Sequence, residues 1–183
     1  MRLAVLGCGP SLVKHYDQRE PFDVVIAVNT AGWIYPCHWL AFTDRHIIEP
    51  ILRGEYPPPI GGCLTNKNNV IPEGCVRERL PIQDRSIGLL TPAMVALAAA
   101  QRMTECAYTF PNALMFAATF KPATLDVFGF DCAMTEQDIA GVRGYHTRKR
   151  WITELPWIRL TLAAFSKVTI RGDSADKVKA WVL

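Results

Sequence analysis

The fold of this chain is indicated most clearly by the segment Leu3-Ala4-Val5-Leu6-Gly7-Cys8-Gly9-Pro10-Ser11-Leu12. Its first four residues are all apolar, as in a strand whose two faces are both buried in a parallel sheet. Two glycines and a proline then end the strand, and a short helix is expected to follow with Ser11 as its N-cap. A strand, a glycine turn and a helix in this order form the opening unit of many nucleotide-binding α/β domains.

The alternation of strand and helix continues along the chain. Further strands are predicted over 23–28, 38–42, 63–65, 125–130 and 167–171, and longer helices over 92–102, 111–120 and 151–165. Apolar strands that alternate with helices predict a mostly parallel sheet covered on both faces. The predicted fold class is therefore α/β and Rossmann-like. The length of 183 residues, without an internal repeat or a linker, predicts a single domain over 1–183.

Composition narrows the function classes. A net charge of +3 is too small to predict nucleic acid as a partner. The six cysteines form no C-x-x-C pair, so we predict reduced thiols rather than a zinc site. No apolar stretch is long enough to cross a bilayer and no secretory leader is recognised, which predicts a cytoplasmic protein. The aromatic residues around Trp33 and over 151–157 are core, an acceptor platform or a dimer face, so a homo-oligomer stays open.

The glycine turn predicts a phosphate site. Glycine lets the backbone turn tightly and approach a ligand closely, and a following helix directs free N–H groups and partial positive charge at the turn. The residues predicted to bind a nucleotide here are Gly7, Gly9, Pro10 and Ser11. The alternative is a tight connection that binds nothing. A dinucleotide fingerprint would place a third glycine where Leu12 stands, which disfavours NAD.

Polar residues end three of the predicted strands. Asn29, Asp44 and Asp131 each follow a buried run, and the carboxyl ends of parallel strands are where such sheets bind ligands. Asn29 can donate and accept hydrogen bonds, which suits a ribose or a base. The alternatives are an Asx turn for Asn29, a helix cap for Asp44 and a loop-forming role for Asp131.

A basic segment near the end of the chain carries the candidate base. His146 is followed by Arg148 and Lys149, beside the start of a predicted helix. Neighbouring cations disfavour the imidazolium, so His146 is expected to be neutral and able to take a proton. The same cations would hold a phosphate. The alternative is a solvated basic loop.

These motifs resemble those of bacterial sialyltransferases that use CMP-sialic acid, typified by lipooligosaccharide sialyltransferases of Campylobacter. The resemblance covers the turn at 7–12, the strand 25–29, the helix at 109–120, the strand 125–131 and the Gly-Tyr-His at 144–146. Related turns occur in 6-hydroxymethylpterin-diphosphokinase-like proteins. The chain departs from the family in having only fourteen residues between Asp131 and His146, where the family has a longer lid-like segment.

The resemblance implies a metal-independent glycosyltransferase whose donor is a CMP-type nucleotide sugar and whose acceptor is an unidentified glycan or small molecule. The roles it implies are phosphate and sugar binding by Gly9, Pro10 and Ser11, nucleotide binding by Asn29, a place near the donor for Thr109, removal of the acceptor proton by His146, and stabilisation of the leaving phosphate by Arg148 or Lys149.

Three other hypotheses stay open. The first is a pterin or nucleotide pyrophosphokinase, which would need magnesium and would draw on Asp44 and Asp131. The second is a nucleotide-binding module without catalysis, in which His146 is idle. The third is an NAD-dependent enzyme, which is weakened because Asn29 replaces the acidic residue expected at the end of the second strand.

Overall fold

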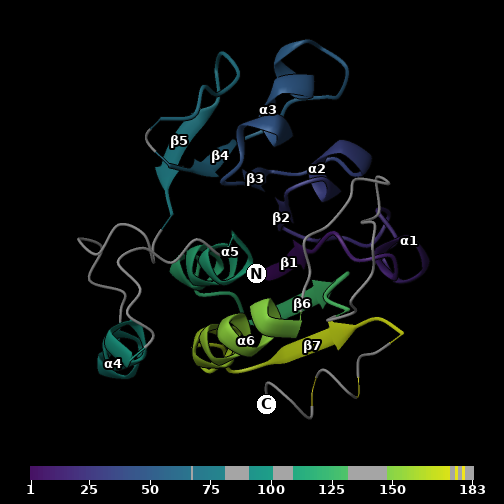
Figure 1. Cartoon of the computed structure of the whole chain (residues 1–183). Coiled ribbons are helices and arrows are strands. Elements are labelled where there is room, and N and C mark those ends of the chain that lie inside the picture. Colours follow the sequence, from purple (N-terminus) through teal and green to yellow (C-terminus); the bar gives the residue numbers. More distant parts are fainter. Residues whose placement is uncertain are drawn as a thin grey trace.

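The computed structural model of the chain describes residues 1–66, 68–80, 91–100, 109–131 and 148–173, with Asp176 and Lys179 beyond them. Within these residues lies a seven-stranded sheet in which all neighbouring strands are parallel (Figure 1). The strands are β1 (Arg2–Leu6), β2 (Val24–Val28), β3 (Trp39–Ala41), β4 (Gly62–Thr65), β5 (Val76–Arg79), β6 (Thr124–Phe128) and β7 (Val168–Arg171). The prediction of an α/β, Rossmann-like domain is confirmed.

The strand order places the candidate site. The sheet runs β5-β4-β3-β2-β1-β6-β7, so the chain builds outward from β1 on one side and then crosses to the other side. The direction of growth therefore reverses between β1 and β6. Open α/β sheets bind ligands beyond the carboxyl ends of the strands at such a reversal.

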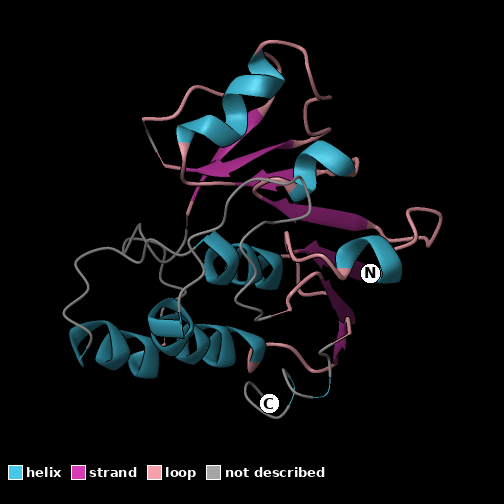
Figure 2. Ribbon diagram, turned by 45° about the vertical axis from the view of Figure 1, so that its right-hand side comes forward, coloured by secondary structure: helices cyan, strands magenta, loops and turns pink. Residues whose placement is uncertain are grey.

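Six helices are described, and they cover both faces of the sheet (Figure 2). They are α1 (Leu12–His15), α2 (Ala31–Ile34), α3 (Arg45–Leu52), α4 (Pro92–Ala100), α5 (Thr109–Thr119) and α6 (Arg148–Leu162). Helices α5 and α6 pack on one face, α1 to α3 pack on the other, and α4 contacts α6. None of the helices in the described ranges has the length and apolar character needed to cross a bilayer.

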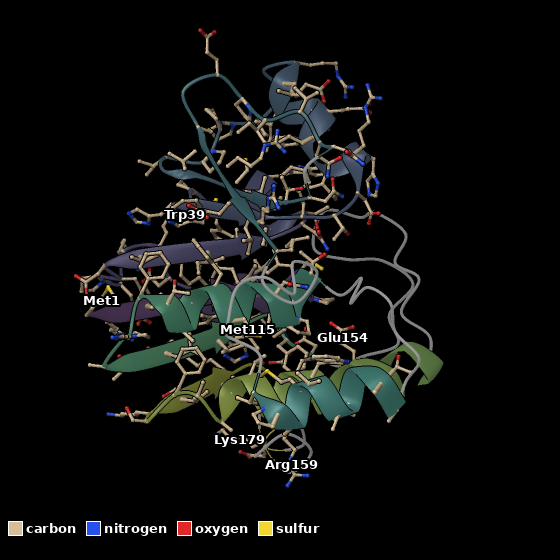
Figure 3. All side chains as sticks on the ribbon, turned by 90° about the vertical axis from the view of Figure 1, so that its left-hand side faces the viewer. Met1, Trp39, Met115, Glu154, Arg159 and Lys179 are labelled. Carbon is tan, nitrogen blue, oxygen red and sulfur yellow. The ribbon has the colours of Figure 1, made fainter. Side chains whose placement is uncertain are left out.

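The core has two layers because strand side chains alternate between the two faces of the sheet. On β1, Leu3 and Val5 join the layer under α5 and α6, while Ala4 and Leu6 join the layer under α1 to α3. All four side chains are fully buried, which explains the unbroken apolar run in the sequence. Figure 3 shows the side chains that fill these layers.

One charge lies inside the sheet. Asp126 on β6 has a side chain that is only 5% exposed, and it accepts hydrogen bonds from Nε of Arg2 at 3.1 Å and from Nε of Arg171 at 3.0 Å. Glu20 pairs with the same two guanidinium groups. These partners compensate a carboxylate whose burial alone would be costly. The two carboxylates in turn raise the pKa of Arg2, chiefly through its hydrogen bond to Asp126 and then through that to Glu20.

The helix ends differ from the sequence predictions in part. Thr91 caps α4, since its hydroxyl accepts a hydrogen bond from the Met94 amide at 3.3 Å. Ser11 and Asp44 occupy N-cap positions, but their side chains make no capping hydrogen bond. Pro50 and Pro156 lie inside α3 and α6, which continue through them.

Candidate functional site

The glycine turn lies at the carboxyl end of β1, directly beside the end of β6. The amide of Gly7 donates to the carbonyl of Phe128 at 2.8 Å, and the amide of Gly9 donates to the carbonyl of Gly129 at 2.9 Å. These bonds continue the pairing of β1 with β6 past the ends of the strands. Two of the N–H groups expected at a phosphate therefore already have partners within the protein.

The glycines of this turn are needed for close packing of two loops. A Cβ atom added to Gly7 would lie 2.6 Å from the carbonyl oxygen of Gly129, and one added to Gly9 would lie 2.5 Å from Oδ2 of Asp131. Gly129 itself has a φ of 63°, a left-handed conformation that favours glycine. The tight connection weighed as an alternative thus accounts for these glycines without a ligand.

Ser11 and Asp131 were predicted separately, and the structure joins them. The Ser11 amide donates to Oδ2 of Asp131 at 2.8 Å, and the Ser11 hydroxyl donates to Oδ1 of the same carboxylate. A Cβ atom added to Gly172, after β7, would lie 2.9 Å from Oγ of Ser11. Loops from β1, β6 and β7 therefore meet at one carboxylate. Helix α1, which follows, has only four residues and contributes little dipole.

A polar cluster of Lys14, His15 and Asp173 lies beside this turn. Asp173, in the loop after β7, accepts from Nζ of Lys14 at 2.7 Å and lies 2.7 Å from Nε2 of His15. The hydrogen bond from Lys14, followed by that from His15, lowers the pKa of Asp173 below its usual value. Lys14 and His15 were not selected as site residues from the sequence, because a lysine and a histidine on a short helix have no distinctive pattern.

Asn29 stands at the carboxyl end of β2 and combines two unfavourable features. Its backbone has a φ of 51°, and its Oδ1 atom is buried without a hydrogen-bond partner among the described residues. An Asx turn would use this oxygen, so the alternative considered for Asn29 is not formed. Its backbone is anchored, since its amide donates to the carbonyl of Ala41 at 2.9 Å. The side-chain oxygen therefore still requires a donor.

The ends of β3 and β4 carry a second polar group. Thr109, the buried first residue of α5, has its hydroxyl 3.3 Å from that of Thr43, which follows β3. The carbonyl of Thr43 accepts from the side chains of Asn66 and Asn69 in the loop after β4. Sequence reasoning predicted Thr109 but not the other three. The asparagine-rich run at 66–69, directly after a buried strand, is the signal that could have located them.

Asp44 and Asp131 are not brought together. Asp44 is exposed after β3, whereas Asp131 follows β6, and these strands are separated by β2 and β1. Three strand spacings amount to roughly 14 Å, too far for two carboxylates to share one metal ion.

The remaining predicted residues are His146, Arg148 and Lys149, and the structure does not describe their side chains. His146 lies outside the described residues. Arg148 and Lys149 begin α6, and their side chains are not described.

No family model, curated protein or solved structure matches this chain. Its function must therefore be inferred from its own residues.

Proposed function

We propose that this chain binds a nucleotide beyond the carboxyl ends of β1, β2 and β6. We further propose that it is a glycosyltransferase whose donor is a CMP-type nucleotide sugar. The reversal of strand order between β1 and β6 supports the location, and the sequence resemblance supports the reaction.

Asn29 carries the proposal of a nucleotide site. A left-handed backbone at a non-glycine residue costs free energy, although asparagine tolerates it better than most residues. Leaving a buried oxygen unpaired costs a further ~1–3 kcal/mol. Costs of this kind gather at functional sites, where a ligand supplies the missing contact. A ribose hydroxyl or the amino group of a base would supply the donor.

In the proposed reaction the acceptor hydroxyl oxygen attacks the anomeric carbon of the donor. A carbon–oxygen bond forms there while the bond from that carbon to the phosphate oxygen breaks, and the nucleotide leaves as its monophosphate. His146 takes the proton of the acceptor hydroxyl. Arg148 or Lys149 stabilises the negative charge on the departing phosphate.

The substitution Asn29→Gly tests the site. Glycine accepts the left-handed backbone and removes the unpaired oxygen, so the ligand-free variant should be more stable than wild type by ~1–2 kcal/mol. It should lose the rise in melting temperature that CMP, UDP, GDP or ATP gives to the wild-type chain. The measurement is a thermal-shift series with each nucleotide, with and without magnesium.

Lys121→Gly is the matched control, because Lys121 is exposed, has a left-handed φ of 48° and precedes β6, at the opposite edge of the sheet. It should relieve similar backbone strain and keep the nucleotide response. An Asn29→Gly variant that is less stable than wild type and keeps its nucleotide response would refute the proposed site.

A nucleotide-binding module without catalysis is the second candidate. It is favoured by the turn after β1. The Gly7, Gly9 and Ser11 amides of this turn are bonded within the protein, so they are not available to stabilise a leaving phosphate. His146→Ala separates the two. Loss of turnover with retained nucleotide affinity indicates transfer, whereas no turnover in the wild-type chain indicates the module. A response to ATP that requires magnesium would instead indicate the pyrophosphokinase.

A further inference from the structure

The loop after β4 is tied to neighbouring strands by polar side chains. Asn66 and Asn69 donate from their side-chain amides to the carbonyl of Thr43, over 3.3 and 2.9 Å. Asn69 also donates to the hydroxyl of Thr65 at 2.9 Å. Three hydrogen bonds thus attach this short loop to the carboxyl ends of β3 and β4. These contacts fix Asn66 and Asn69 at the carboxyl edge of the sheet.

Arg77 of β5 holds the same loop from the other side. Its NH1 group donates to the carbonyl of Asn66 at 2.9 Å and its NH2 group donates to the carbonyl of Asn69 at 2.5 Å. The rigid planar fork spans two carbonyls, which a lysine ammonium on a flexible stem does not reproduce. None of the ion pairs between described residues includes Arg77. Its interactions here serve the loop backbone.

The loop lies in line with the proposed nucleotide site. Val28 of β2 pairs with Ala41 of β3, which pairs with Leu64 of β4, so three adjacent strands end side by side. The loop after β4 is therefore about 10 Å from the end of β2. In dinucleotide-binding α/β domains the phosphate lies after the first strand and the ribose at the end of the second. The same line continues to β3 and β4, where the base would lie.

We propose that Asn66 and Asn69, with the Thr43 hydroxyl, recognise the base of the nucleotide, and that Arg77 is the positioning residue that holds the two asparagines in place. This inference rests on the proposed nucleotide site. Base edges carry both donors and acceptors, and threonine hydroxyls and asparagine amides can match either. Arg77 contacts the loop carbonyls and acts through them.

The variant Arg77→Lys tests this role with two ligands. The first ligand is whichever of CMP, UDP, GDP and ATP stabilises the wild-type chain most, and the second is ribose 5-phosphate, which lacks a base. Affinity for the nucleotide should fall roughly tenfold, the effect of losing one or two well-placed hydrogen bonds. Affinity for ribose 5-phosphate should be unchanged. Isothermal titration calorimetry measures both.

Arg45→Lys is the matched control, because Arg45 is exposed and pairs only with Glu49 on its own helix among the described residues. Asn66→Ala provides a second, milder disruption of the loop if Arg77→Lys does not fold. Equal losses for both ligands, or no loss for either, would overturn the role of the loop and leave the nucleotide site standing. A wild-type chain that binds neither ligand would overturn both proposals.

Discussion

The turns after β1 and β2 lie side by side at one edge of the sheet, yet their polar groups are satisfied in opposite ways. In the turn after β1, the amides of Gly7, Gly9 and Ser11 and the Ser11 hydroxyl all bond to the end of β6 or to the loop after it. At the end of β2, the Oδ1 atom of Asn29 is buried, and none of the described residues donates a hydrogen bond to it. A glycine turn that resembles a ligand site can therefore be a junction between loops. The buried acceptor that lacks a donor among the described residues lies instead at the end of the neighbouring strand, β2.

The largest effect on stability is expected from Gly7→Ala, in the turn after β1. The added methyl group would press on the backbone carbonyl of Gly129, which cannot move without disturbing β6. We expect a loss of about 3 kcal/mol in the free energy of unfolding, measured by urea denaturation. Gly54→Ala is the control, since Gly54 has a φ of 78° and no atom within 4 Å of the added Cβ. It should cost only the left-handed strain, roughly 1–2 kcal/mol. Equal costs for the two variants would contradict a junction at Gly7.

A smaller effect is expected from Asp131→Ala. This change leaves the Ser11 amide and hydroxyl without their acceptor, and Ser11 is only 3% exposed. The free energy of unfolding should fall by roughly 2 kcal/mol, the usual cost of leaving buried donors without an acceptor. Chemical denaturation of the ligand-free chain measures it. Asp44→Ala, at an exposed carboxylate without a capping hydrogen bond, should have little effect. A gain in stability in Asp131→Ala would contradict the contrast between the two turns, because it would show that the turn after β1 is also strained in the absence of a ligand.

The smallest effect concerns Asp173, which joins the loop after β7 to α1. Its pKa is lowered by hydrogen bonds from Lys14 and then His15, so its ionised form is favoured by folding. The resulting stability is present above the unfolded pKa, about 3.9, and is lost as pH falls through the lower folded value. Because the group is exposed, we expect only a slight difference in melting temperature between wild type and Asp173→Asn at pH 6, and convergence of the two at the acid end of the profile. A gap that widens as pH falls would contradict the assignment.

Much of the fold could be predicted because buried positions of strands and helices recur in the sequence as a regular pattern of apolar residues. Leu3 to Leu6 read as a strand with two buried faces, and the structure places it near the middle of the sheet. The helix predicted over 92–102 was equally local, and the structure has α4 over Pro92–Ala100 with the Thr91 hydroxyl as its cap. The caps expected at Ser11 and Asp44 were not formed, and for Ser11 the reason is that a distant carboxylate competes for its hydroxyl.

The candidate site could be predicted only in part. Strand ends mark its edge, so Asn29, Asp44 and Asp131 were located correctly on the carboxyl side of the sheet. The contact between Ser11 and Asp131 could not be predicted from the sequence. These residues are 120 positions apart and come together only through the pairing of β1 with β6. Arg77 escaped notice for the same reason, since its partners are backbone carbonyls that leave no side-chain signature.

The sequence alone determined that this chain folds as an α/β domain and that its polar strand ends share one edge, because hydrophobic periodicity and turn residues act over a few neighbouring positions. Only the three-dimensional packing determined that the glycine turn closes onto β6, that the buried Oδ1 of Asn29 finds no donor in the described part of the chain, and that Arg77 bonds to the carbonyls of Asn66 and Asn69. These outcomes depend on strand order and loop packing, which bring distant residues within hydrogen-bonding distance and set which polar groups are satisfied.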